Sequence, residues 1–438
     1  MATRDVTEAY HTIPLHPSQW PAAVVCVLDS LFCIDTCVAF GASPSCGAYG
    51  WVADVGAEIL RARGIGPVDK WVDDHIFFCI PCKHLQGYNA AHLGWHKEMT
   101  HLGLRYNVSH IYFKGVVLPG GMTEECSEDC RWPIEDLSQS APRSVHDAHF
   151  SYNLEDINRV LEELGIPWEL SKDQPFASLT IYIGFLWDLE AHTITLSTSK
   201  RDKYSGAIND WLARLHHNLK HVQELYGKLL YAASVLPQGR AHLTGLESML
   251  ASCAKHHFVP HHPDKDIERD LCWWLDRILS GSVTRPIHIP TSLHDTDAFS
   301  NASSGIGIDI GIGTQWRAWR LQADWASHKG TKDIGWAEAM GFELVVHYLD
   351  SLLSGPQHLI LYGDNTGVIE GWRIGRHCNR AVNEIFKLLH TFIKSSLTVS
   401  SVVSCYVPCA CNPADQLYRG LYSPTHLLLP LITLPEHL

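Results

Sequence analysis

The spacing of hydrophobic residues predicts a mixture of strands and helices. In residues 1–80, short apolar runs flank one helical stretch, with proline and glycine turn signals between them. Residues 81–150 are rich in His, Cys and Gly and are predicted to form an irregular insertion. A helix is predicted at 151–164, followed by short strands at 179–187 and 193–196.

The second half of the chain begins with a long helical region. In residues 200–280, apolar residues recur three or four positions apart, which is typical of amphipathic helices. Residues 282–291 contain two prolines and are predicted to be a linker. The pattern beyond them predicts a strand, a glycine-rich turn, and then a helix at about 336–353, a strand at 359–362, a helix at about 378–394 and a strand at 399–406.

The composition is that of a globular protein. Its 438 residues are 46% hydrophobic and 18% charged, which suffices for two or three domains with apolar cores. No apolar run has transmembrane length, the first residues lack the form of a signal peptide, and the 14 cysteines form no compact framework. We therefore expect an intracellular protein, cytoplasmic or nuclear, with no membrane partner.

The charge distribution bears on possible partners. The chain has 34 Lys and Arg against 47 Asp and Glu, a net charge of −13, which argues against tight binding of nucleic acid over its whole surface. Residues 200–260, however, contain eight Lys and Arg against four Asp and Glu. A nucleic-acid duplex could follow this basic strip.

A first set of acids lies in the N-terminal part. Asp73 and Asp74 are adjacent between apolar runs, as at the tip of a β-hairpin, and Asp5 lies at a predicted strand end. Polymerases hold two Mg²⁺ ions about 3.5–4 Å apart with carboxylates from two structural elements. The three acids are therefore a candidate metal site, although an isolated Asp-Asp pair is more often a solvated turn.

A second set of acids is spread over the last third of the chain. Its members lie in a strand before a glycine-rich turn, near a helix start, at the end of an apolar strand and after the last strand: Asp297, Glu338, Asp364 and Asp415. In an alternation of strands and helices, such positions can converge at one edge of a sheet. There they could hold two Mg²⁺ ions that orient a water molecule against an RNA phosphate.

Five segments resemble, in order, the palm motifs of reverse transcriptases. They are residues 5–17 (DVTEAYHTIPLHP), 40–45 (FGASPS), 71–74 (WVDD), 164–172 (LGIPWELSK) and 182–186 (YIGFL). The amino-acid sequences of these segments are most similar to those of DIRS-type and related long-terminal-repeat retrotransposons. The third segment has Trp71 where the family usually has Tyr.

The resemblance to reverse transcriptases implies roles for the matching residues. The catalytic triad would be Asp5, Asp73 and Asp74, with the first two as metal ligands. The substrate-binding residues would be a steric gate against ribose, two residues of the template-gripping segment and a lysine near the incoming triphosphate: Tyr10, Gly41, Ser45 and Lys172. The family has a fingers subdomain before its first motif, of which this chain has four residues, so we expect impaired polymerase activity.

Four further segments resemble the ribonuclease H of retroelements. They are residues 296–298 (TDA), 337–339 (AEA), 363–366 (GDNT) and 412–420 (NPADQLYRG). The resemblance implies that the catalytic, metal-binding acids are Asp297, Glu338, Asp364 and Asp415, with Mg²⁺ or alternatively Mn²⁺. Asp295 and Glu343 are nearby acids; Asp297 is preferred because it directly precedes the Ala-x-Ser of the motif.

We therefore predict an α+β protein in four parts. They are a reverse transcriptase palm (1–190, with the insertion at about 81–150), a helical thumb and connection (191–285), a ribonuclease H-like α/β domain (286–425) and a C-terminal tail (426–438). The predicted function is Mg²⁺-dependent RNA cleavage in RNA–DNA hybrids, with RNA-directed DNA polymerase activity as an ancestral function. The alternative is a catalytically inactive remnant that acts at most as a nucleic-acid-binding or interaction protein. Whether a partner chain supplies fingers stays open.

Two weaker patterns are interpreted as structural. Two cysteines in 79–82 and two histidines in 92–96 approach a zinc pattern, but their spacing is shorter than in zinc fingers and the chain is rich in both residue types. The pair Trp273–Trp274 could stack on bases. Its helical spacing with apolar neighbours favours a place in the core.

Overall fold

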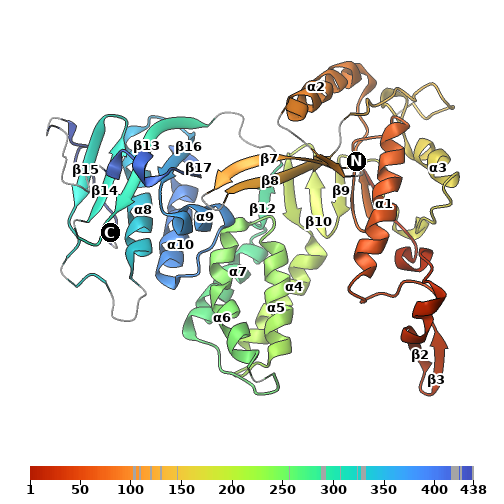
Figure 1. The fold of residues 1–438 in the computed structure, drawn as a ribbon, viewed down its shortest axis with the longest axis horizontal. Helices are drawn as coiled ribbons and strands as arrows, with labels where there is room; N and C mark the ends of the chain where they lie inside the picture. The colour runs from red at the N-terminus through yellow and green to blue at the C-terminus, as the bar shows by residue number, and fades with distance from the viewer. Residues whose placement is uncertain are drawn as a thin grey trace. The chain divides into compact units, whose positions relative to one another are not determined.

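The computed structural model describes the chain except for residues 102–104, 108–109, 119–120, 129–130, 146, 256, 288–292, 306, 323, 327–331, 416–423, 425–426 and 437–438. For residues 105–107, 110, 113–118 and 121–128 it describes the backbone alone. As predicted, the described part mixes helices and sheets (Figure 1). It divides into two compact units, 1–117 with 121–192 and 118–120 with 193–438. None of its described helices combines the length and apolarity needed to cross a bilayer.

The first unit is built around a three-stranded antiparallel sheet in the order β1-β5-β4. Its strands are β1 (Ala2–Asp5), β4 (Val68–Trp71) and β5 (Asp74–Phe77). Strands β4 and β5 form the predicted hairpin, with Trp71 opposite Asp74. Helices α1 (Ser45–Ala62) and α3 (Leu154–Glu162) enclose a core with the hairpin that includes Leu60, Val68, Phe77, Ile157 and Leu161. This core fixes the base of the hairpin and so the position of its tip.

The segment predicted to be irregular, 81–150, is in fact structured. It contains α2 (Cys82–His101), β6 (Arg105–Asn107), β7 (His110–Leu118) and β8 (Gly121–Glu128). Among the residues of α2, only Leu85 and Met99 are buried. The helix therefore has little of the amphipathic pattern from which a helix is predicted. The remaining strands of the unit are β2 (Val24–Leu28), β3 (Leu31–Ile34), β9 (Leu179–Tyr182) and β10 (Phe185–Asp188).

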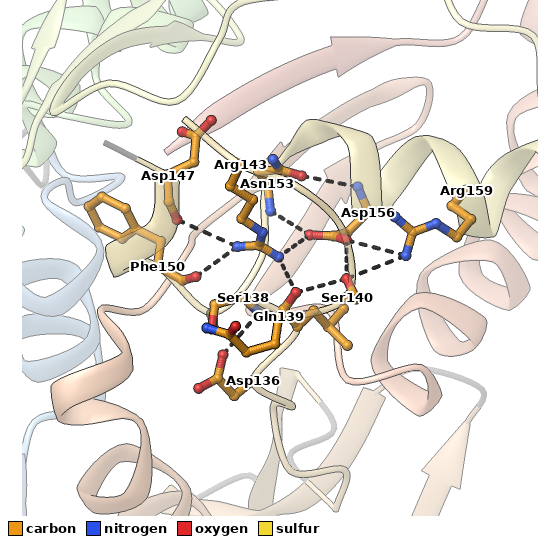
Figure 2. A network of polar contacts seen from close by, with 12 residues as sticks. Asp136, Ser138, Gln139, Ser140, Arg143, Asp147, Phe150, Asn153, Asp156 and Arg159 are labelled. Atoms are coloured by element: carbon orange, nitrogen blue, oxygen red, sulfur yellow. Dashed lines mark hydrogen bonds and ion pairs between the residues drawn. The ribbon is translucent and has the colours of Figure 1, made fainter. Parts of the chain in front are cut away.

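A buried ion pair fastens the segment before α3 to that helix (Figure 2). The guanidinium of Arg143 donates to a carboxylate oxygen of Asp156, and both side chains are 2% exposed. Arg143 also donates to the carbonyls of Leu137 at 2.6 Å and Phe150 at 2.9 Å. Asp156 in turn accepts the amide of Asn153, which caps α3. Because a charge left unpaired at this depth is costly, the pair holds the segment in place.

The second unit contains a five-stranded sheet in the order β15-β14-β13-β16-β17. Strands β13 (His294–Ala302), β14 (Ile308–Ile312) and β15 (Gln315–Trp319) are antiparallel neighbours. Strands β16 (Gln357–Gly363) and β17 (Val399–Tyr406) continue from β13 in parallel. Helices α8 (Ile334–Leu352), α9 (Thr366–Ile374) and α10 (Arg380–Ser395) connect the parallel strands. The helices predicted at about 336–353 and 378–394 and the strands predicted at 359–362 and 399–406 are present as α8, α10, β16 and β17, whereas β14, β15 and α9 were not predicted.

Helix α8 covers one face of this sheet. A Cβ added at Gly341 of α8 would lie 3.1 Å from Ile308 and 3.4 Å from Ser300. Since neighbouring residues of a strand point to opposite faces, Ser300 and Ile308 face the helix, whereas Asn301 and Asp309 face the other side.

The same unit contains the predicted helical region. Its elements are α4 (Thr198–Leu212), α5 (Leu219–Ala232), α6 (Thr244–Cys253) and α7 (Lys265–Leu279). Strand β11 (Thr193–Leu196) pairs with β12 (Thr284–Pro286), which lies in the segment predicted as a linker. Asp270 of α7 is 4% exposed and accepts a hydrogen bond from Lys387 of α10 at 2.7 Å. Trp274 is fully buried, as predicted, and Trp273 is partly buried.

Candidate active sites

The three acids of the first set meet at the tip of the β4–β5 hairpin. Asp5 at the end of β1 lies directly opposite Asp74 at the start of β5. Asp73 lies in the turn, and its carbonyl accepts the amide of Val6 at 3.3 Å. Val72 in the same turn has a φ of 59°, a strained conformation for a β-branched residue, of the kind that occurs at functional sites. The fold thus brings together acids that are far apart in the sequence.

These carboxylates influence one another electrostatically. Burial, followed by the charges of Asp5 and Asp73, raises the pKa of Asp74 to about 6, against the opposing effect of Lys172. The pKa of Asp73 is also raised, first by burial and then by Asp5, against the effect of a backbone hydrogen bond. A bound cation would stabilise these neighbouring negative charges, because it would offset their mutual repulsion.

The ammonium of Lys172 forms an ion pair with the carboxylate of Asp5. Its ammonium donates to a carboxylate oxygen of Asp5, and this hydrogen bond raises the pKa of Lys172. The nearby backbone is anchored by the amide of Glu169, which donates to the Asp5 carbonyl at 2.8 Å. The Asp5 side chain is 10% exposed, whereas that of Lys172 is 64% exposed. The ammonium therefore reaches the acid from the solvent side.

A buried arginine that sequence reasoning missed supports this arrangement. Arg4, 3% exposed, pairs with Asp173 through Nη2–Oδ2 at 2.7 Å and Nε–Oδ1 at 3.2 Å. Its guanidinium also lies 4.8 Å from the centre of the Trp168 ring. Arg4 precedes Asp5 and Asp173 follows Lys172, so the pair fixes the end of β1 that carries Asp5 and the short helix η4 (Leu170–Lys172) that carries Lys172. The available signal was a charged residue inside a strand next to a candidate acid.

Tyr10 lies beside the triad, where the resemblance would place a steric gate. Its ring packs edge-on against Phe40 and Tyr49, at centroid distances of 4.4 and 5.9 Å. Burial, then Cys46 and then the charge of Asp73 raise the pKa of Tyr10. Its hydroxyl is therefore within electrostatic reach of Asp73.

The two residues of the template-gripping segment have different surroundings. Gly41 is exposed, has a φ of 85° and would meet no atom within 4 Å if it carried a Cβ. Ser45 begins α1, is 3% exposed and donates to the Ala39 carbonyl at 2.7 Å. The Ser45 hydroxyl therefore shapes the loop, while Gly41 leaves room beside it.

Three acids of the second set surround one end of the five-stranded sheet. Asp364 directly follows β16, Glu338 lies in α8, and Asp415 follows the short helix η6 (Cys409–Cys411). Cys409 faces all three: its thiol donates to Asp364 Oδ2 at 2.6 Å. This bond, burial and the charges of Asp364, Asp415 and Glu338 raise the pKa of Cys409 to about 11. Sequence reasoning had given Cys409 no place in this site.

Glu338 is the most strongly perturbed of these acids. It is 7% exposed. Burial, followed by the charges of Asp364 and Asp309, raises its pKa to about 8, against the opposing effect of a hydrogen bond from the amide of Ala302. A carboxylate shifted this far in a cluster of acids is typical of functional sites.

Asn412 holds the last acid against the sheet. Its side-chain amide donates to the Ser300 carbonyl of β13 at 3.0 Å. Its backbone carbonyl accepts the amide of Asp415 at 3.0 Å. Both residues are buried. The Asn-Pro-Ala-Asp segment therefore acts as a turn that directs Asp415 toward β13.

In the strand register of the described residues, Asp297 is not the β13 residue beside Asp364. Ser300 pairs with Gly363, so the β13 residue beside Asp364 is Asn301. Asp297 lies four positions before Asn301 along the chain. It is exposed, has a φ of 49° and sits at a register shift between Asp295 and Phe299. The motif spacing favoured Asp297 as the residue beside Asp364, whereas the strand register places the side-chain amide of Asn301 at that position.

The described residues include carboxylates that could bind a metal ion, but these do not form a complete set of protein ligands. Among them, no three His, Cys, Asp or Glu side chains are arranged to hold one ion. Mg²⁺ is usually bound by one or two carboxylates with waters and substrate phosphates. Asp364 Oδ1 is a buried oxygen with no hydrogen-bond partner in the described part of the chain, and Asp5 already holds a cationic group. Both features suit a divalent cation.

The basic strip predicted in 200–260 lies partly on α4 and α5. Arg214, His221 and Lys228 line a surface cavity between these helices. Asp210 and Glu224 line it as well, so acids offset the positive charge at this point.

Solved structures that are similar to the chain include foamy viral proteins. The protease–reverse transcriptase in complex with an RNA/DNA hybrid matches with a TM-score of 0.43 and 12% identity, over 93% of this chain and 43% of that one. The same type of protein with double-stranded DNA matches with a TM-score of 0.39 and 13% identity, over 93% of this chain and 56% of that one. The chain thus spans about half the length of these neighbours. No protein-family model and no curated protein sequence matches it. At this identity and TM-score, activity has to be argued from the residues.

Proposed function

We propose that this chain acts on RNA–DNA hybrids as a retroelement-type reverse transcriptase and ribonuclease H, with Mg²⁺ or Mn²⁺ as cofactor. The observation that supports this proposal is the meeting of distant acids in two groups. One group joins Asp5 to the Asp73–Asp74 pair, and the other joins Glu338 and Asp415 to Asp364. Ordinary surface acids repel one another and are not gathered in this way.

At the first group the chemistry would be nucleotide addition to a primer. Asp5 and Asp73 would hold the metal ions, and when bound these activate the attacking hydroxyl and stabilise the leaving phosphate. Lys172, now on Asp5, would turn to the triphosphate and could donate a proton to the leaving pyrophosphate. Tyr10, packed beside the triad, would exclude a ribose 2′-hydroxyl.

At the second group the chemistry would be hydrolysis of the RNA strand. Glu338, Asp364 and Asp415 would hold the metal ions and position a water molecule against the phosphate. The thiol of Cys409 occupies Asp364 Oδ2, so it would have to turn away before that oxygen could bind an ion. Glu338 would lose its proton when a cation approaches, because a nearby positive charge lowers its pKa.

Cleavage of a hybrid is the direct test of the second group. Purified full-length protein is incubated with Mg²⁺ and a hybrid whose RNA strand is labelled. We expect cleavage that falls at least about a hundredfold in Asp364→Asn and is unchanged in Asp324→Asn, an exposed acid of the same unit. Equal cleavage by wild type and Asp364→Asn would refute the hydrolytic role.

Primer extension tests the first group separately. With an RNA template, a DNA primer and deoxynucleotides, we expect impaired extension by the wild type, which Asp73→Asn abolishes and Asp364→Asn leaves unchanged. If Asp73→Asn extends the primer as well as the wild type does, the palm assignment is wrong.

A second candidate function is hybrid binding without turnover. The observation that favours it is Asn301, a neutral residue beside Asp364 where the hydrolytic site needs an acid. In this case the protein would bind the hybrid with a steep dependence on salt and cleave nothing at any Mg²⁺ or Mn²⁺ concentration. Fluorescence anisotropy of a labelled hybrid, read beside the cleavage assay, separates the two functions.

A further inference from the structure

A row of ion pairs joins helices α7 and α10 of the second unit. In each pair, an acid of one helix meets a base of the other: Asp266–Arg380, Arg269–Glu384 and Asp270–Lys387. The residue numbers rise together on the two helices, so α7 and α10 run in the same direction. Each step of this ion-pair row therefore matches opposite charges, and the next turn of both helices should continue it.

The ion-pair row instead ends at a small cavity. The cavity lies between α7, α10 and the short helix η5 (Pro237–Leu243). Its volume of about 30 Å³ is room for about two water molecules. Among the described residues that line it, none is Asp or Glu, whereas Arg277, Lys387 and Lys394 are cationic. The acid that would continue the row is missing from this turn.

Two of the three cations at the cavity lack a close counter-charge. Lys387 is paired with Asp270 and Glu384. By contrast, the ammonium of Lys394 has no ion-pair partner among the described residues. The Nε of Arg277 is buried without a hydrogen-bond partner in the same part of the chain. The neighbouring Asp276 lies 4.0 Å from it, too far for a hydrogen bond, and is 72% exposed.

Stacked rings hold the donors around the cavity in place. The guanidinium of Arg277 lies 5.3 Å from the centre of the Trp273 ring, and this ring stacks on His242 at a centroid distance of 3.9 Å. His390 lines the cavity from α10, and its Nε2 is a further buried atom for which the described residues provide no partner. A ligand that binds to groups already held in position loses little affinity to their ordering.

We propose that this cavity is a phosphate site, in which Arg277 and Lys394 bind the oxygens of a phosphate group that takes the place of the missing acid in the ion-pair row. Charge-assisted hydrogen bonds from Arg and Lys to phosphate are among the stronger polar contacts. The small volume suits one phosphate group whose other oxygens stay in solvent. The group can belong to the backbone of a bound nucleic acid or to inorganic phosphate, because both present the same oxygens.

Thermal unfolding of the full-length protein measures the binding of inorganic phosphate. Sodium phosphate replaces sodium chloride at constant ionic strength and pH, and we expect a rise in melting temperature that saturates. Lys394→Gln should raise the apparent Kd at least about tenfold. Because Lys394 is exposed, its replacement leaves the core intact. Arg277→Gln should have the same effect on the Kd.

The matched control is Lys265→Gln. Lys265 is an exposed lysine of α7 that does not line the cavity, so this variant should respond to phosphate as the wild type does. Phosphate also stabilises proteins by its exclusion from their surface. The informative quantity is therefore the difference between Lys394→Gln and Lys265→Gln, which surface exclusion does not produce.

Binding of a labelled RNA–DNA hybrid distinguishes the two sources of phosphate. If the hybrid backbone is the source, Lys394→Gln should weaken binding and reduce the slope of log affinity against log salt by about one. If inorganic phosphate is the source, Lys394→Gln should bind the hybrid as the wild type does and still lose the response to phosphate. Equal phosphate responses and equal hybrid binding in wild type and Lys394→Gln would overturn the site. The cleavage assay at Asp364 tests the hydrolytic function independently of these outcomes.

Discussion

Replacement of Glu338 by Gln should stabilise the metal-free protein at alkaline pH. Glu338 is 7% exposed, and its pKa is raised to about 8 by burial, then by Asp364. Gln has the same shape and can still accept the amide of Ala302, but it carries no charge. The variant therefore removes only the cost of ionising a buried acid.

The size of the effect follows from proton linkage. Below the unfolded pKa of 4.5, the carboxyl is protonated in both states and costs nothing. Between 4.5 and about 8, the unfolded chain ionises first, so stability falls by about 1.4 kcal/mol per pH unit. Above the folded pKa the cost is constant, at about 5 kcal/mol. The difference between wild type and Glu338→Gln should thus grow by about 4 kcal/mol from about pH 5 to about pH 9.

Urea unfolding in EDTA at these two pH values measures the difference. EDTA is needed because a bound cation would lower the pKa of Glu338 and remove the effect. Glu343→Gln, on the same helix but in the core, is the control for a glutamate whose charge is not part of this cluster. A Glu338→Gln variant that is no more stable than the wild type at about pH 9 would show that burial and the neighbouring acids do not raise the pKa of Glu338.

Three further predictions concern single positions. Asp297→Asn should cleave a hybrid as the wild type does, because Asp297 is exposed and away from Asp364; a loss as large as that of Asp364→Asn would reinstate it as a ligand. Arg4→Met should lower the free energy of unfolding by about 3 kcal/mol, since it breaks a buried bidentate pair with Asp173; urea denaturation measures this, and an unchanged midpoint would contradict the role of the pair. Gly307→Ala should cost about 3 kcal/mol or more, because at its φ of 144° a Cβ would lie 1.8 Å from the Trp319 carbonyl oxygen; a melting temperature equal to that of the wild type would contradict it.

Several elements could be predicted from the local hydrophobic pattern, and the structure has them at the predicted positions. The acid pair at 73–74 lies at a hairpin tip because apolar strands flank it on both sides. Asp364 follows a buried apolar strand, and Glu338 lies in a helix whose apolar residues face the core. Each of these placements needs only a few neighbouring residues, which is why it can be read from the chain. By contrast, α2 was missed, since it buries so little that no pattern marks it.

Which side chains share a site was decided by tertiary structure. Asp295, Asp297 and Asn301 of β13 are all candidates from the sequence for the residue beside Asp364. Only the pairing of Ser300 with Gly363 shows that this residue is Asn301. Register between strands far apart in the chain depends on the packing of the whole sheet, and a bulge between Asp295 and Phe299 shifts it further. The burial of Asp309 is likewise a product of packing from several segments. Local hydrophobic pattern therefore determined the elements, and long-range pairing determined which acids can act together.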